Sequence, residues 1–172
     1  DIPFWALHIG PNEYANLREV LESNYVNDGH VTTRFEKEIA MLVGAKHAVA
    51  ATSGTSALFL SLAALGVGHG DEVIVPDLTF IATANAVTLA GATPVLVDID
   101  PVTLNISPEA FKQAITERTR AVMPVHVSGR SADLSAIGAI AKDHGLAVVE
   151  DAAEALASFH DGRALGTIGI AG

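Results

Sequence analysis

Cysteine is absent from the 172-residue sequence, and only 17% of its residues are charged. Without cysteine the chain has neither a disulfide framework nor a reactive thiolate, which suits a reducing cytoplasm. Lysine and arginine number 10 against 20 aspartates and glutamates, so the positive surplus of a nucleic-acid-binding protein is missing. Apolar runs such as 58–65 are far shorter than the ~20 residues of a membrane span, and no signal segment opens the chain. We therefore expect a cytoplasmic protein that binds neither nucleic acid nor membrane.

The residues that are present indicate a folded domain. Hydrophobic residues make up 49% of the sequence, which excludes a disordered chain, and the length suffices for one domain with a sizeable core. Short apolar runs, most of them rich in valine and typical of buried strands, span 47–51, 72–75, 94–97, 121–125 and 146–149. Helical stretches lie between them at 55–65, 81–89, 108–115 and 134–144. This alternation predicts an α/β fold with a mainly parallel sheet and helices on both faces.

Two further helices are expected before this pattern. Pro11 suits the first turn of one helix, and Thr33 with Glu36 forms a candidate capping box for the other. Their apolar faces have helical spacing and consist of Tyr14, Leu17 and Leu21, then Phe35, Ile39 and Leu42.

Turn and cap signals mark the second half of the chain. Ser107-Pro108 predicts a helix start, Gly145 a helix end, and Asp161-Gly162 a hairpin turn. The sequence then stops at Gly172 without a closing helix. We therefore expect the chain to be a fragment of a larger domain.

The turn Ser53-Gly54-Thr55 is a candidate anion site. It follows the first predicted strand and opens an apolar helix, and ligands of open α/β sheets bind beyond the carboxyl ends of the strands. Free N–H groups and the helix dipole suit a phosphate there, and Gly54 allows close approach to the backbone. An ordinary N-cap with a tight turn explains the same residues. The turn matches neither a Walker loop nor the Gly-x-Gly-x-x-Gly dinucleotide pattern.

Other polar side chains also follow predicted strands. Asp151 ends a buried run, so its carboxylate must be solvated, cap the next segment, or pair with a cation such as the protonated nitrogen of a pyridine cofactor. Asp98 and Asp100 resemble a metal-binding pair of glycosyltransferases, but Pro101 directly after them favours a turn. For His126 a hydrogen-bonded structural role is favoured. The histidines show no metal-ligand spacing, so we expect no metal site.

Taken together, these segments resemble the DegT/DnrJ/EryC1/StrS family of sugar aminotransferases. The ordered set covers essentially the whole chain, beginning with Phe35-Glu36 near the start. Its most recognisable stretches are Thr52-Ser53-Gly54-Thr55, Gly91-Ala92-Thr93-Pro94, Glu150-Asp151-Ala152-Ala153-Glu154 and Gly166-Thr167-Ile168-Gly169. Members of this family bind pyridoxal 5′-phosphate (PLP) and have aspartate-aminotransferase fold type I. The resemblance implies that residues 1–172 form the N-terminal part of the large PLP-binding domain, without the small C-terminal domain.

The resemblance also implies roles for individual residues. The turn of Ser53, Gly54 and Thr55 matches the phosphate site, and Phe80 matches the aromatic residue that stacks on the pyridine ring. Asp151 matches the acid that keeps the ring nitrogen protonated, so that the ring accepts electrons. Glu154 matches a position near the phenolic oxygen, where a glutamate must share a proton or take a partner.

By the same resemblance, the Schiff-base lysine lies beyond Gly172, and two subunits complete each site of a homodimer. The implied reaction moves an amino group, from glutamate, to a nucleotide-linked keto sugar for polysaccharide biosynthesis. Two alternatives within the family stay open: a dehydratase that acts on sugars, and a non-catalytic regulator with the same fold. Only the residue at the lysine position distinguishes them from an aminotransferase. Ser128 and Ala157 replace a tyrosine and a glycine common in the family, which leaves the substrate open.

Overall fold

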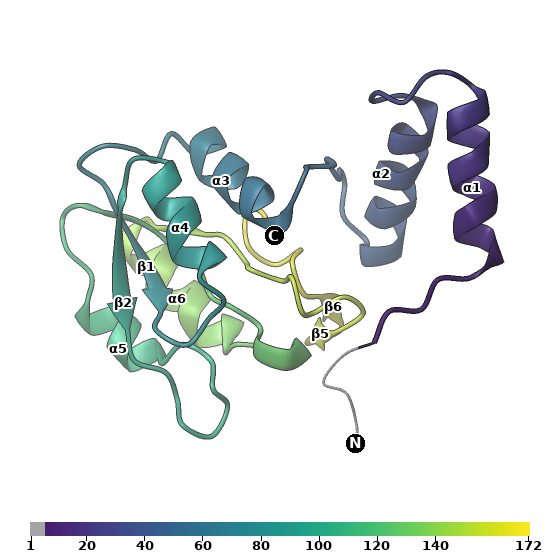
Figure 1. Cartoon of the computed structure of the whole chain (residues 1–172). Helices are drawn as coiled ribbons and strands as arrows, with labels where there is room; N and C mark the ends of the chain where they lie inside the picture. The colour runs from purple at the N-terminus through teal and green to yellow at the C-terminus, as the bar shows by residue number, and fades with distance from the viewer. Residues whose placement is uncertain (1–5) are drawn as a thin grey trace.

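A parallel sheet forms the centre of the molecule. The computed structural model describes residues 6–172. Its four strands are β1 (Glu72–Pro76), β2 (Thr93–Val97), β3 (Thr119–Val122) and β4 (Ala147–Val148). They lie in the order β2-β1-β3-β4, and all three pairings are parallel. The predicted α/β fold with a parallel sheet is therefore confirmed (Figure 1).

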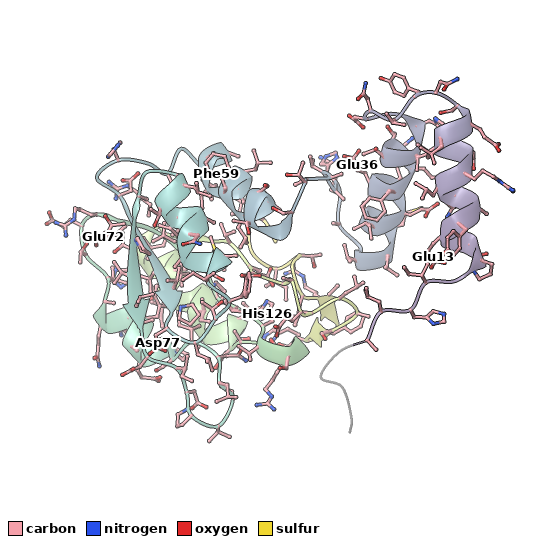
Figure 2. The ribbon with its side chains drawn as sticks, viewed as in Figure 1. Glu13, Glu36, Phe59, Glu72, Asp77 and His126 are labelled. Carbon is pink, nitrogen blue, oxygen red and sulfur yellow. The ribbon has the colours of Figure 1, made fainter. Side chains whose placement is uncertain are left out.

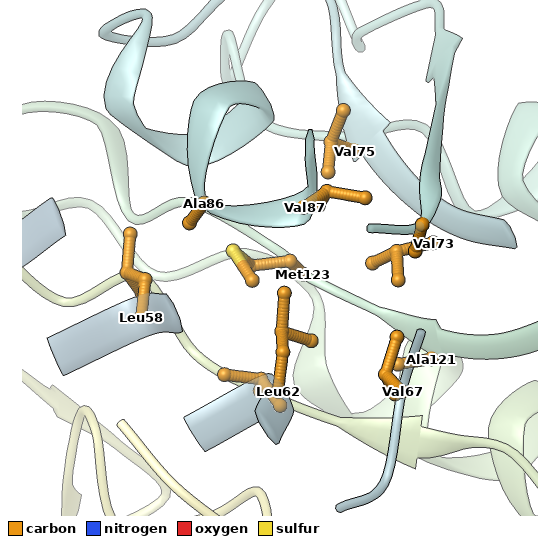
Figure 3. Packing of buried hydrophobic residues seen from close by; sticks show 11 residues of the cluster. Leu58, Leu62, Val67, Val73, Val75, Ala86, Val87, Ala121 and Met123 are labelled. Atoms are coloured by element: carbon orange, nitrogen blue, oxygen red, sulfur yellow. The ribbon is translucent and has the colours of Figure 1, made fainter. Parts of the chain in front are cut away.

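Helices cover both faces of the sheet because its central strand is apolar on both sides. Val73 and Val75 of β1 pack in one cluster with residues of α3 (Gly54–Ala64) and α4 (Ala82–Leu89) (Figure 3). The intervening Ile74 packs in a second cluster with residues of α5 (Pro108–Gln113) and α6 (Leu134–His144). Alternate side chains of a strand point to opposite faces, so one strand supports two cores. Both clusters exclude water and fix the sheet edge at which the strands end.

Two N-terminal helices, α1 (Pro11–Glu22) and α2 (His30–Val43), stand apart from the sheet (Figure 1). Pro11 occupies the first turn of α1, as expected. In the described part of the chain neither helix has a buried residue, and Phe35 and Leu42 of the expected apolar face of α2 are 54% and 64% exposed.

The expected capping box of α2 is wrong. The helix begins at His30 after Gly29, so Thr33 lies inside it and its N–H donates to the Gly29 carbonyl oxygen. The side chain of Glu36 instead accepts a hydrogen bond from the Ala50 N–H at 2.9 Å. A helix-compatible sequence upstream of Thr33 therefore extends the helix past the local capping signal.

The strand expected at 47–51 is also wrong. This segment forms no ladder with any described strand, and Val49 is 80% exposed. Apolar β-branched residues favour an extended chain, but a strand also needs a neighbour for its backbone hydrogen bonds.

The remaining local signals agree with the structure. The Ser107 hydroxyl caps α5 by accepting from the Ala110 N–H at 3.2 Å, and Pro108 is the first helical residue. Gly145 ends α6 in a left-handed conformation at φ 66°. Antiparallel β5 (Phe159–His160) and β6 (Arg163–Ala164) form the expected hairpin. Among residues 6–172, no helix has the length and hydrophobicity to span a membrane.

Candidate functional site

A cavity of about 720 Å³ lies at the carboxyl ends of the strands. The bridge between Val125 and Asp151 extends the parallel sheet to its edge. The segments that follow the strands meet there, as a parallel sheet requires. The cavity is lined by all six residues that the sequence predicts as cofactor contacts: Ser53, Gly54, Thr55, Phe80, Asp151 and Glu154. Their individual roles stay predictions.

The first wall of the cavity is the N-terminus of α3. Ser53 is its N-cap, and the Ser53 hydroxyl accepts from the Ser56 N–H at 3.1 Å. The N–H groups of Gly54 and Thr55 have no acceptor within residues 6–172. The N-cap interpretation and the anion-site interpretation are therefore compatible, because the cap leaves two donors free at the positive end of the helix dipole.

Gly54 leaves open space at this helix end. A Cβ atom built on Gly54 would meet no atom within 4 Å, and the residue does not have a positive φ. The fold therefore tolerates a side chain at this position. Because neither packing nor backbone conformation requires glycine here, the missing side chain is best explained by a ligand that approaches the backbone.

Asp151 lies on another wall of the cavity and is only 7% exposed. Its Oδ2 accepts from the hydroxyl of Thr83 at 2.7 Å, and its Oδ1 accepts from the Ala153 N–H at 3.3 Å. Thr83 is a fully buried residue of α4 and also bonds to Thr79 at 2.7 Å. Asp151 thus caps the next segment, and no cationic side chain pairs with it in the described chain. A cationic ligand in the cavity would meet a carboxylate whose orientation is already fixed.

Glu154 and Phe80 complete the predicted set. Glu154 takes a partner, as a glutamate there must: its Oε2 accepts from the backbone N–H of Ser128 at 2.6 Å. Phe80 is 77% exposed at the cavity wall, so its ring is free to pack against a ligand. Ser128 itself has a left-handed φ of 53°, and its conformation presents the N–H to Glu154.

His126 is a buried structural histidine, as favoured from the sequence. It is completely buried, its Nδ1 accepts from the Ala132 N–H at 3.1 Å, and its Nε2 lies 3.0 Å from Oε2 of Glu150. Burial by itself raises the pKa of Glu150, but hydrogen bonds from His126 and from three backbone N–H groups outweigh it and hold that pKa below 4.5.

The sequence interpretation missed Glu150 and Thr83. Glu150 directly precedes Asp151 at the end of a buried strand, so strand alternation places the two carboxylates on opposite faces and buries one of them away from the cavity. That alternation was the available signal for Glu150. Thr83 lies 68 residues from Asp151 in the sequence, and no local pattern links the two.

Asp100 stabilises the turn that begins at Pro101, as the sequence favoured. The Oδ1 of Asp100 accepts from the N–H groups of Thr103 and Val102 at 2.7 and 2.9 Å, and these bonds lower the pKa of Asp100. Neither Asp98 nor Asp100 lines the cavity. Within the described residues, no group of three or more potential ligands could hold a metal ion.

Comparisons with known proteins agree with this fold. Residues 8–172 match the model of the DegT/DnrJ/EryC1/StrS aminotransferase family. The spore coat polysaccharide biosynthesis protein SpsC of Bacillus subtilis is 51% identical over 170 residues, which are 99% of this chain and 44% of SpsC.

Solved structures show the same likeness. DesV of S. venezuelae, in complex with a ketimine intermediate, is 44% identical with a TM-score of 0.88, over 90% of this chain and 42% of DesV. The PLP form of Spr1654 from Streptococcus pneumoniae is 32% identical with a TM-score of 0.93, over 98% of this chain and 47% of Spr1654. The chain thus spans less than half the length of these relatives, and the expected fold type I is confirmed. The chain belongs to the DegT/DnrJ/EryC1/StrS aminotransferase family.

Proposed function

We propose that the protein carrying this chain is a PLP-dependent sugar aminotransferase, and that residues 1–172 are the N-terminal part of its large domain. One observation carries the proposal. The two free N–H groups of Gly54 and Thr55 and the nearly buried carboxylate of Asp151 line one cavity of about 720 Å³. Membership of an aminotransferase family supports the same activity.

The residues present fit PLP. The cofactor has an anionic phosphate at one end and a basic pyridine nitrogen at the other, so it needs donors and a carboxylate in one cavity. The N-terminus of α3 provides the donors, with open space at Gly54, and Asp151 provides the carboxylate. The exposed ring of Phe80 adds an aromatic surface to the same cavity.

Each residue has a separate task in this proposal. Gly54 and Thr55 bind the phosphate through their N–H groups, and Asp151 holds a proton on the ring nitrogen. Thr83 fixes the rotamer of Asp151 by donating to its Oδ2. Phe80 packs on the ring and excludes water from one side of it. When bound, PLP supplies the electron-accepting ring and carries the amino group between donor and acceptor. The lysine that binds PLP covalently is expected beyond Gly172.

The substrates and assembly are proposed on more general grounds. A role of SpsC in spore coat polysaccharide biosynthesis supports a sugar acceptor. We take this acceptor to be a nucleotide-linked keto sugar, and the amino donor to be glutamate. A cytoplasmic homodimer, in which a second subunit completes each site, is proposed with them.

The test is made on the full-length protein that contains this chain. Wild type, Asp151→Asn and Asp143→Asn are titrated with PLP and assayed with glutamate and a panel of nucleotide-linked keto sugars. We expect the wild type and the exposed-site control Asp143→Asn to bind PLP and form amino sugar. Asp151→Asn should bind PLP more weakly and lose nearly all turnover, because the amide cannot hold the ring proton as a carboxylate does. Unchanged turnover in Asp151→Asn overturns the site, and loss of the sugar hydroxyl without amination identifies a dehydratase.

A further inference from the structure

Two titratable residues close to the cavity take no part in the proposed chemistry. Glu150 and His126 are both completely buried, and Glu150 is the residue immediately before Asp151. Burial of a carboxylate costs free energy unless hydrogen-bond donors compensate for the lost water. The groups that donate to Glu150 therefore indicate its role. Figure 2 shows His126 in the α/β part of the chain, away from α1 and α2.

The carboxylate of Glu150 joins three segments of the chain. Its Oε2 contacts Nε2 of His126 at 3.0 Å and accepts from the N–H of Gly166 at 2.8 Å. Its Oε1 accepts from the N–H groups of Ile168 and Gly169, both at 2.6 Å. The Glu150 side chain, just after β4, therefore binds both the loop 166–169 and the segment that follows β3.

The histidine has a defined orientation in this cluster. Because its Nδ1 accepts from the Ala132 N–H, its Nε2 holds the ring proton and donates to Glu150. The backbone N–H of His126 donates to the carbonyl oxygen of Asp151 at 3.2 Å, and the Asp151 N–H donates to Pro124 at 2.9 Å. The same segment is thus bonded to Asp151 through its backbone and to Glu150 through a side chain.

The loop that Glu150 holds is packed closely against β4. A Cβ atom on Gly169 would lie 2.4 Å from the Val148 carbonyl oxygen of β4. The Ile170 N–H donates to that oxygen at 2.8 Å, and the Glu150 N–H donates to Ala171 at 2.8 Å. Loss of the carboxylate contacts would leave the N–H groups of Gly166, Ile168 and Gly169 without their acceptor.

We propose that Glu150 and His126 are positioning residues for the cofactor cavity. Together they hold the strand end that bears Asp151 and the 166–169 loop in the binding geometry before the cofactor arrives. This rests on the proposed PLP site. Pre-organisation of this kind lowers the cost of binding, so its loss weakens the ligand even where the variant remains folded.

Paired substitutions of His126 separate positioning from simple stability in the full-length protein. His126→Gln keeps an N–H that can donate to Glu150, whereas His126→Asn keeps an acceptor for the Ala132 N–H but loses that donor. We expect His126→Asn and Glu150→Gln to raise the Kd of PLP at least tenfold, and to shift the pH at which the visible band of bound PLP changes. His126→Gln should stay within about threefold of wild type. Phe111→Leu, a substitution of a buried core residue that does not line the cavity, should lower stability without changing the band or the Kd.

A measurement on the wild type does not depend on any variant folding. Amide hydrogen exchange of Gly166, Ile168 and Gly169 is followed in the full-length protein before and after PLP is added. We expect strong protection before PLP is added, because Glu150 already holds these groups. Fast exchange without PLP, or equal Kd values for His126→Asn and His126→Gln, overturns the inference while leaving the PLP site intact. Failure of the wild type to bind PLP rejects the proposed function instead.

Discussion

The substitution Gly54→Val should weaken PLP binding without lowering the free energy of unfolding. In the chain as folded, a Cβ atom at this position meets nothing within 4 Å, and Gly54 does not have a positive φ. Valine has a higher helix propensity than glycine, so the free energy of unfolding should be unchanged or slightly higher. PLP binding should weaken, because a branched side chain stands beside the free N–H groups of Gly54 and Thr55.

The size of the loss follows from those two donors. A hydrogen bond to a charged group contributes about 1.5–3 kcal/mol. Displacing the phosphate from one donor should therefore raise the Kd of PLP roughly ten- to hundredfold. A loss of both donors would be larger.

The assay combines PLP titration with denaturant unfolding of the full-length protein. Gly138→Ala is the matched control, since a Cβ atom at Gly138 of α6 also meets nothing within 4 Å and the residue lies outside the cavity. It should raise stability by up to about 1 kcal/mol and leave the Kd unchanged. A Gly54→Val protein with wild-type affinity, or one that loses stability and affinity together, would refute the reasoning.

Three further outcomes are expected. Thr83→Val removes the hydroxyl that donates to Asp151 at 2.7 Å, so both the stability and the PLP affinity of the full-length protein should fall, as measured by unfolding and titration. The pKa of Glu150 is lower in the folded protein than its unfolded value near 4.5. The ionised Glu150 therefore stabilises the fold fully above pH 4.5, and this stabilisation is lost as the pH falls through the folded pKa. We expect the acid unfolding of Glu150→Gln to depend less steeply on pH than that of wild type. Residues 1–172 alone should not catalyse transamination in an assay with PLP and glutamate, because none of the lysines of the described chain lines the cavity; activity equal to that of the full-length protein would contradict this.

Local chemistry accounts for the elements that the sequence predicted well. The cap at Ser107, the left-handed Gly145 and the two-sided apolar strand of 72–75 depend on neighbours close in sequence or on the strand's own composition. Such signals act before any tertiary contact forms. The parallel sheet then brings the ends of its strands to one edge, so the residues proposed to bind the cofactor line one cavity.

Tertiary contacts decide the features that the sequence did not predict. The 47–51 segment has strand composition but no described strand beside it, so composition alone gave the wrong element. Glu36 fits a capping box, yet it bonds to Ala50, 14 residues away. The partners of Glu150 lie 16–24 residues away along the chain, and the hydroxyl that orients Asp151 comes from 68 residues away. No pattern within a single element encodes such pairs.

The most direct test of the site is a crystal structure of the full-length protein with PLP. The account predicts phosphate oxygens within about 2.7–3.2 Å of the N atoms of Gly54 and Thr55, and the pyridine nitrogen at a similar distance from the carboxylate of Asp151. Phe80 should lie against the ring. A cofactor bound with its phosphate away from the N-terminus of α3, or with its ring nitrogen facing a group other than Asp151, would contradict the central claim.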